Sequence, residues 1–359
     1  MKRKTILFLA AVLVVAMLTA ACGQQPAAQQ QSADKKGPAW ANGLTPLPKE
    51  TTVKVGMKAV VSDAGILIGI AKGYYKDLGI TIENVQFNSG QEMINQLAAG
   101  QLDVGAAVTA AGLFNAMGRD IPVKIVADKG INVPGKGYYR LVIRKDLAGE
   151  IKDFKDLKGR KIAVVGTASL DEVYLVRCLA KGDLTLKDID EQVIRSFPDM
   201  LTALSNKSID AAMVIEPFVA QGIAKDMIDP WKDPQEYDPD AQIAILVYGT
   251  SMTKNPELAK RFMTAYVKAL RDYNDAFFKD KGKKEMIDLL AKQSVVKDPV
   301  LYEKMFPTGL NPDGYVRVKG VGADLEWYKA NKLLQKEIKL EDAVDNQYVD
   351  FAVKTLGKY

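Results

Sequence analysis

The sequence has no histidine and only two cysteines among its 359 residues. Without histidine, the chain has no histidine-containing catalytic triad, no histidine metal ligand and no imidazole acid–base catalysis. Cys178 lies in the segment VYLVRCLAKG, where apolar residues recur at helical spacing. We therefore expect Cys178 to be a buried, unreactive thiol, and we expect neither a metal ion nor a cofactor.

The sequence also has only a small excess of positive over negative charge. The formal net charge of +5 includes Lys2, Arg3 and Lys4, so the rest of the chain carries about +2, which is too small an excess to indicate nucleic-acid binding. Hydrophobic residues make up 48% of the chain and charged residues 26%. This balance is typical of a globular protein with enough apolar material for two cores.

The first 21 residues are typical of a signal peptide. A basic start is followed by an apolar run from Ile6 to Leu18, which is shorter than the ~20 residues that span a bilayer. The run ends in LTAAC, which resembles the lipobox of bacterial lipoproteins, although Thr19 stands where leucine is usual. We expect lipidation of Cys22, with ordinary cleavage after Ala21 as the alternative. Residues 22–50 have the composition of a flexible tether.

An internal repeat relates two parts of the chain at an offset of 107 positions. At this offset Asp103 aligns with Asp210, and Ser62 aligns with Ser169. Both copies alternate short apolar strands with amphipathic helices, which predicts two α/β lobes with mostly parallel sheets. A helical C-terminal region has no counterpart in the repeat.

The predicted lobes are discontinuous in sequence. We assign residues 51–139 and 249–359 to lobe 1 and residues 140–248 to lobe 2, with crossings near residues 138–142 and 245–249. Ligands of such sheets bind at the carboxyl ends of the strands. The predicted ligand-binding residues are Ser62, Asp63, Ser89, Gly90, Val108, Thr109, Gly166, Thr167, Ala168, Ser169 and Glu216.

Several of these candidates also have a structural interpretation. Ser89 and Ser169 begin SGQE and SLDE, which are capping-box patterns at helix N-termini. Asp63 could favour a helix dipole without contacting a ligand. The turn from Gly166 to Ser169 is a stronger candidate, because free N–H groups at a helix N-terminus can receive an anion or a carbonyl group.

Three segments carry a resemblance to a known family. They are GIAKGYYKDLGITIENVQFNSGQEMINQLAAGQLDVGAA, DLKGRKIAVVGTAS and SIDAAMVIEPF, in this order. They resemble the solute-binding proteins of ABC importers in the nitrate, sulfonate, taurine and thiamine-precursor group. The resemblance implies a type II periplasmic-binding-protein-like fold, in which two α/β lobes close on a ligand cleft, with a helical C-terminal extension here.

The same resemblance implies a function and partners. We expect an exported, lipid-anchored, monomeric protein that captures a small organic solute and delivers it to an ABC permease in the membrane. In the family, the matching positions that hold the ligand are Ser62, Asp63, the turn from Gly166 to Ser169, and Glu216. Carboxylates at Asp63 and Glu216 on opposite lobes predict a solute with a donor or cationic nitrogen as well as an acceptor. Its ring could lie beside tyrosines near the crossings, namely Tyr138, Tyr139 or Tyr248.

Enzymatic activity is the main alternative to solute binding. The fungal thiamine-pyrimidine synthases resemble this family, but they use a histidine, which this chain lacks; we therefore expect no enzymatic activity. A second alternative is a sensor that binds a solute in order to signal, and the sequence does not exclude it. The segment GINVPGKG resembles a P-loop but lacks its Ser or Thr and precedes a strand-like sequence, so ATP hydrolysis is not predicted.

Overall fold

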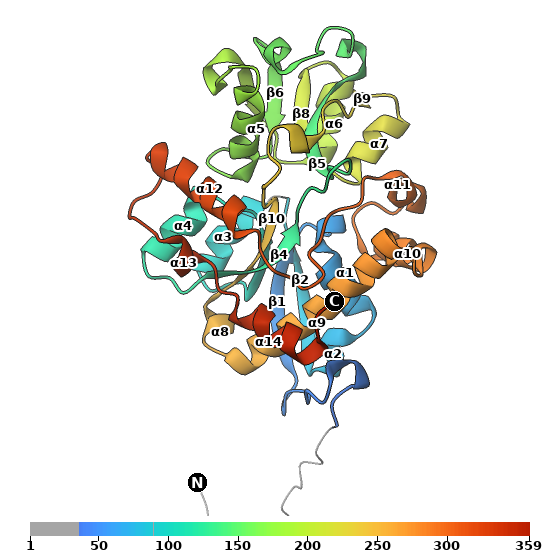
Figure 1. Cartoon of the computed structure of the whole chain (residues 1–359), viewed down its shortest axis with the longest axis vertical. Coiled ribbons are helices and arrows are strands. Elements are labelled where there is room, and N and C mark those ends of the chain that lie inside the picture. Colours follow the sequence, from blue (N-terminus) through green and yellow to red (C-terminus); the bar gives the residue numbers. More distant parts are fainter. Residues whose placement is uncertain (1–35, 89) are drawn as a thin grey trace, which may run out of the picture. The chain divides into compact units, whose positions relative to one another are not determined.

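A computed structural model describes residues 36–88 and 90–359. The predicted signal peptide, Cys22 and Ser89 lie outside the described residues. The unit Lys36–Tyr359 contains two five-stranded sheets, each packed with helices (Figure 1). Within these residues, no helix combines the length and apolar character needed to cross a membrane.

The first sheet has the strand order β2-β1-β3-β10-β4. Its strands are β1 (Thr51–Met57), β2 (Ile80–Gln86), β3 (Val104–Ala107), β4 (Lys124–Gly130) and β10 (Ala244–Tyr248). The helices that follow the first three of these strands are α1 (Ala64–Ala71), α2 (Tyr74–Asp77), α3 (Gly90–Ala98) and α4 (Ala111–Gly118). Strands β1, β2 and β3 are parallel, whereas β10 is antiparallel to both β3 and β4.

The second sheet repeats this arrangement with the order β7-β6-β8-β5-β9. Its strands are β5 (Tyr139–Arg144), β6 (Lys161–Val164), β7 (Asp190–Val193), β8 (Ala211–Ile215) and β9 (Ile228–Asp229). Its helices are α5 (Leu170–Ala180), α6 (Phe197–Ser205) and α7 (Phe218–Ala224). Strand β5 lies between β8 and β9 and is antiparallel to both. The prediction of mostly parallel sheets is confirmed for four strands of each sheet, which run in one direction. The remaining strand, β10 or β5, is antiparallel to its neighbours.

The 107-residue repeat has a structural basis. The Asp103 carboxylate accepts the Lys54 N–H at 2.7 Å, and the Asp210 carboxylate accepts the Lys161 N–H at 3.0 Å. Strands β1 and β3 also pair in the same register as β6 and β8. Each aspartate thus fastens the turn before one central strand to the neighbouring strand of the same sheet.

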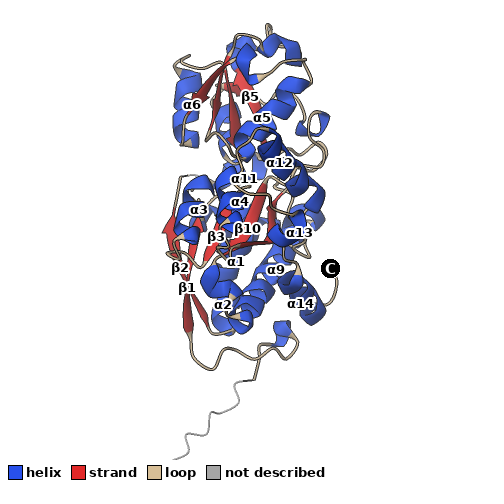
Figure 2. Ribbon diagram, turned by 90° about the vertical axis from the view of Figure 1, so that its left-hand side faces the viewer, coloured by secondary structure: helices blue, strands red, loops and turns tan. Residues whose placement is uncertain are grey.

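The helical C-terminal region packs mainly on the first sheet (Figure 2). Its helices are α8 (Thr250–Thr253), α9 (Pro256–Lys279), α10 (Lys283–Gln293), α11 (Pro299–Lys304), α12 (Val318–Ala330), α13 (Leu340–Ala343) and α14 (Gln347–Leu356). The Asn255 side chain caps α9 by accepting the Leu258 N–H at 3.2 Å, as the sequence predicts. Phe262 and Tyr266 of α9 are fully buried in the hydrophobic core that also contains Val53 and Val55 of β1.

Strand β10 shifts one expected boundary. Residues 244–248 lie in the first sheet, so the chain returns to lobe 1 before Ala244 and not near Gly249. The strand AILVY is apolar throughout and buried at every position, so its pattern alone did not indicate which sheet it joins. The two connections between the sheets are residues 131–138 and 230–243.

Candidate functional site

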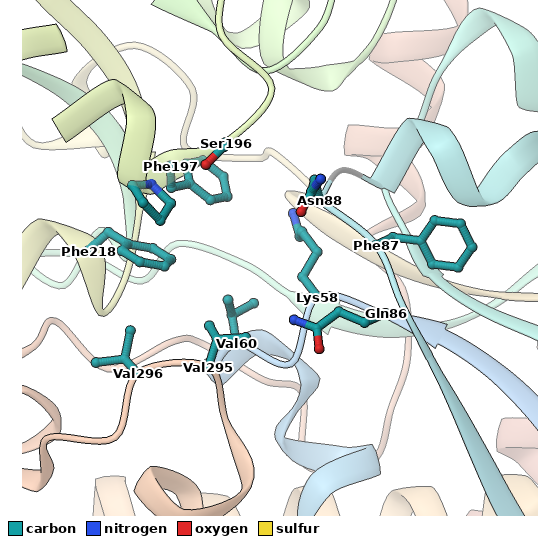
Figure 3. A pocket seen from close by; sticks show the side chains of 11 residues that line it. Lys58, Val60, Gln86, Phe87, Asn88, Ser196, Phe197, Phe218, Val295 and Val296 are labelled. Atoms are coloured by element: carbon teal, nitrogen blue, oxygen red, sulfur yellow. The ribbon is translucent and has the colours of Figure 1, made fainter. Parts of the chain in front are cut away.

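A pocket of about 230 Å³ lies between the two sheets (Figure 3). Residues from both lobes line it: Lys58, Val60, Gln86, Phe87, Asn88, Ser196, Phe197, Pro198, Phe218, Val295 and Val296. Each sheet contributes side chains that follow its parallel strands, as expected for ligand sites of α/β sheets. The pocket is therefore the candidate solute site.

The fold explains why these side chains meet. Lys58 and Val60 directly follow β1, and Asn88 follows β2. Phe197 and Phe218 are the first residues of α6 and α7, which begin after strands of the second sheet. Their rings stack with centroids 5.7 Å apart and an interplanar angle of 28°. One lobe thus supplies a cation and polar groups, and the other supplies an aromatic wall.

Lys58 is the charged group of this pocket. Its Nζ atom lies 5.3 Å from the centroid of the Phe197 ring, across the cleft. Burial and, next, the positive charge of Lys129 lower the pKa of Lys58 to about 8, although the negative charges of Asp171 and Asp63 oppose this shift. No carboxylate of the described residues lies within ion-pair distance of Lys58.

Ser62 and Asp63, two predicted ligand contacts, follow Lys58 by four and five residues and are fully buried. The Lys129 Nζ atom of β4 is 2.9 Å from an Asp63 carboxylate oxygen, and it donates to the Ser62 hydroxyl at 2.9 Å. The second Asp63 oxygen accepts the Val60 N–H at 3.0 Å. In this conformation both side chains contact protein groups and do not line the pocket.

The predicted turn from Gly166 to Ser169 contacts the other lobe. The Ala168 carbonyl accepts the N–H of Ala111 at 2.9 Å, and the Leu170 N–H donates to the Thr109 carbonyl at 2.9 Å. The Ala168 N–H donates to the Glu172 carboxylate at 2.6 Å. The Ala168 N–H of the turn and the Leu170 N–H after it therefore bind protein oxygens in this structure.

Ser169 departs from the capping-box prediction. Its hydroxyl donates to the Gly166 carbonyl at 2.9 Å and does not accept an N–H group of α5. It also lies 3.2 Å from Asp171, whose carboxylate accepts a hydrogen bond from the Tyr139 hydroxyl. The Ser169 hydroxyl thus stabilises the turn through the Gly166 carbonyl. It also lies close to Asp171, because SLDE contains this aspartate in addition to Glu172.

Glu216 is fully buried, but it does not reach the pocket. Its two carboxylate oxygens accept the Ala220 N–H of its own lobe at 2.9 Å and the Phe306 N–H of the C-terminal region at 3.0 Å. Burial raises the pKa of Glu216 to about 7, although these N–H donors and Arg140 act in the opposite direction. Glu216 thus links lobe 2 to the C-terminal region through hydrogen bonds.

The remaining predicted residues lie near the cleft or in the cores. Gly90 packs closely on Val108, because a Cβ atom at Gly90 would lie 3.0 Å from the Val108 nitrogen. Gly166 and Thr167 line a neighbouring polar pocket of about 390 Å³ that also includes Arg195. The three tyrosines proposed beside a ring are buried and do not line the main pocket; they are Tyr138, Tyr139 and Tyr248.

Ion pairs between side chains also connect lobe 2 with the C-terminal region. Arg177 of α5 lies 2.7 Å from the carboxylate of Asp324 in α12 and also pairs with Asp238. Asp324 is fully buried and accepts the Thr109 hydroxyl at 2.6 Å. Burial raises the pKa of Asp324 to about 6, although Arg177 opposes this shift. The C-terminal region therefore makes polar contacts with lobe 2 through Phe306 and through Asp324.

Sequence reasoning missed the pocket's main contributors, which are Lys58, Phe197, Phe218, Val295 and Val296. Two signals for them were present. Ser196, which aligns with Ser89 in the repeat, directly precedes Phe197, and Phe218 ends the motif SIDAAMVIEPF. Nothing in the repeat pointed to Val295 and Val296, since they lie in the C-terminal region. Within the described residues, no group of three or more Cys, Asp or Glu residues could hold a metal ion.

Comparison with known proteins gives both family and fold. A family model described as NMT1/THI5 like matches residues 61–275. A Brucella abortus protein, provisionally named a binding protein, is 29% identical over 231 residues, covering 63% of this chain and 66% of the relative. The chain thus matches slightly less than two thirds of that relative. The 4-amino-5-hydroxymethyl-2-methylpyrimidine phosphate synthase of Aspergillus parasiticus is 24% identical over 221 residues, 58% of this chain and 62% of the synthase.

Solved structures share the two-lobed fold at low sequence identity. The ligand-binding component of an ABC-type import system from Staphylococcus aureus matches with a TM-score of 0.68 and 17% identity, covering 84% of this chain and 99% of the other. The alkanesulfonate-binding protein SsuA of Xanthomonas axonopodis pv. citri, solved with MOPS, gives a TM-score of 0.66 and 18% identity, with coverages of 83% and 99%. The predicted periplasmic-binding-protein-like architecture is confirmed.

Proposed function

This chain belongs to the NMT1/THI5-like family, and on that premise we propose that it is the solute-binding component of an ABC importer. It captures a small organic solute between its two lobes and delivers it to a membrane permease. The proposal includes export and a lipid anchor at Cys22, which holds the protein at the outer face of the membrane. The import function of the Staphylococcus aureus neighbour and the sulfonate ligand of the Xanthomonas protein support this proposal.

The observation that carries the proposal is the pocket shared by both lobes. Lys58 and Asn88 come from the first lobe, whereas Ser196, Phe197 and Phe218 come from the second. A solute in this pocket contacts both lobes at once, so it binds the closed arrangement more tightly than an open one. Binding then shifts the population toward closure.

Small-angle X-ray scattering tests this mechanism. The purified protein should show a smaller radius of gyration when a solute that stabilises it in a thermal-shift panel is added at saturation. The panel contains nitrate, alkanesulfonates, taurine and thiamine pyrimidines. Phe197→Ala removes the aromatic wall and should weaken both responses, whereas Phe278→Ala changes an exposed ring of α9 and should leave them intact. An unchanged scattering profile with a bound solute argues against capture by closure.

An enzyme that forms or modifies a pyrimidine is the second candidate, because the Aspergillus parasiticus relative is a pyrimidine phosphate synthase. We favour binding, because the pocket holds one charged side chain, Lys58, and no paired acid and base. Mass spectrometry of the protein and its bound solute separates the two candidates. A binding protein releases the solute unchanged, whereas an enzyme leaves a product or an altered side chain.

A further inference from the structure

The pocket has an uneven chemical lining. Of its eleven lining residues, Lys58 is the one charged side chain. Seven others are apolar: Val60, Phe87, Phe197, Pro198, Phe218, Val295 and Val296. The polar uncharged side chains are Gln86, Asn88 and Ser196. Such a lining suits a solute with one charged end and an apolar body.

The two lysines near the cleft differ in their partners. Lys129 is buried and pairs with Asp63 at 2.9 Å. Lys58 is half-buried and has no ion-pair partner within 4.0 Å among the described residues, and its nearest described aromatic contact is the Phe197 ring at 5.3 Å. A partly desolvated ammonium group without a counter-ion is unfavourable, and an anion beside it restores the lost interaction.

The acids near Lys58 are already engaged. Asp63 binds Lys129, and the Asp171 carboxylate accepts hydrogen bonds from Tyr139 and Ser169. Their negative charges act on Lys58 from a distance and favour its protonated form. They do not line the pocket, so they leave its interior without negative charge. This arrangement opposes the cationic solute that the predicted roles of Asp63 and Glu216 implied.

The directions of the side chains favour an anionic solute in this pocket. Figure 3 shows the Lys58 side chain extending toward Asn88, with Phe197 and Phe218 on the opposite side of the pocket and Val295 and Val296 below. Phe87 points away from this group. An anionic head beside Lys58 therefore has Asn88 as a neutral hydrogen-bonding neighbour, while the body of the solute faces the stacked rings.

We propose that Lys58 receives the anionic head of an organic acid whose apolar body packs against Phe197 and Phe218. This inference rests on the proposed function and specifies the class of solute: a monoanion with a compact ring or branched body. Lys58 selects for the charge, and the aromatic wall of lobe 2 selects for the body. Because both contacts form together only in the closed arrangement, the same solute also drives closure.

Binding should depend on pH in a defined direction. The groups that act on Lys58 are Lys129 of β4, Asp171 of α5 and Asp63 before α1, and Lys129 is the one that disfavours its charge. With a Lys58 pKa of about 8 in the unliganded protein, the ammonium form falls at higher pH. The affinity for an anion should then decrease by about tenfold for each pH unit above that value, until the pKa of the liganded lysine is reached.

Matched probe pairs test the role of Lys58. Benzoate is compared with benzamide, and benzenesulfonate with benzenesulfonamide, by calorimetric titration of the purified protein at pH 7. Each pair differs chiefly in charge, so the acid should bind at least tenfold more tightly than its amide. Lys58→Met keeps an unbranched side chain but removes the ammonium group, and it should abolish this preference. Lys54→Met, four residues earlier in β1 and at an exposed position, should retain it.

The outcomes separate the solute class from the general function. Equal affinity for acid and amide, or an acid preference that survives in Lys58→Met, overturns the role of Lys58 while solute capture stands. An acid preference without a decrease in the radius of gyration supports Lys58 but contradicts capture by closure. If none of the four probes binds, the inference is wrong. Thermal unfolding without probe shows whether Lys58→Met folds, and Lys58→Arg, which keeps the charge, should retain the preference.

Discussion

Glu216→Gln should change how stability depends on pH. Glu216 is fully buried at a cis peptide bond to Pro217, and its carboxylate accepts the N–H groups of Ala220 and Phe306. Burial raises its pKa from 4.5 to about 7. Glutamine has a similar shape but no ionisable proton, so the substitution removes this titration and keeps one carbonyl acceptor.

The direction in which stability changes with pH follows from the pKa values of Glu216 in the folded and unfolded states. The folded protein holds the Glu216 proton up to about pH 7, whereas the unfolded chain loses it near pH 4.5. Between these values the unfolded state binds fewer protons, so the free energy of unfolding falls as the pH rises. The stabilising contribution is complete below pH 4.5 and lost above pH 7. At ~1.4 kcal/mol for each pKa unit, the wild type should lose about 3 kcal/mol relative to Glu216→Gln.

Urea denaturation between pH 4 and pH 8 measures this difference. The free energy of unfolding of the wild type should fall relative to that of Glu216→Gln as the pH rises across this range. The difference measured at pH 4 is subtracted first, since it contains every effect of the substitution other than this titration. Glu326→Gln, at an exposed position of α12, is the control and should show no comparable trend. A constant difference between wild type and Glu216→Gln from pH 4 to pH 8 would refute the reasoning, because it would mean that this carboxyl titrates alike in both states.

Two further predictions concern the lobes and the anchor. Arg177→Met should lower the free energy of unfolding by about 3–5 kcal/mol, because it leaves the buried Asp324 carboxylate without its cation. Urea denaturation measures this loss against Lys284→Met, an exposed control. Equal unfolding midpoints of the two variants would contradict the prediction. Labelled fatty acid should be incorporated into the wild type but not into Cys22→Ala; equal label in both proteins, or in neither, excludes the proposed anchor.

Local patterns predicted the elements well. The strand Ala211–Ile215 and the Asn255 cap of α9 were expected from apolar runs and a capping residue, both of which act within a few positions. The repeat predicted the matching roles of Asp103 and Asp210, since a motif copied at a fixed offset folds into the same contacts. Such features depend on neighbours in the sequence or on its internal symmetry.

The site was harder to predict, because partners distant in the sequence decide which groups are free. Asp63 looked available to a solute, but Lys129 neutralises it from 66 positions away. Glu216 also looked available, but Phe306 lies 90 positions away and supplies an N–H group. Lys58 carried no pattern of its own, and it became a candidate only when the fold placed it opposite Phe197.

The C-terminal region sets the limit on what family membership can reveal. The family match ends at residue 275, whereas Val295 and Val296 line the pocket, and Phe306 and Asp324 join the lobes. Two relatives that share the matched part but differ after it would therefore have similar lobes with a different pocket wall and different ties. Under the proposed function, the choice of solute and the ease of closure are specified partly outside the matched segment. Exchange of residues 295–296 between relatives should then alter solute preference without altering the fold.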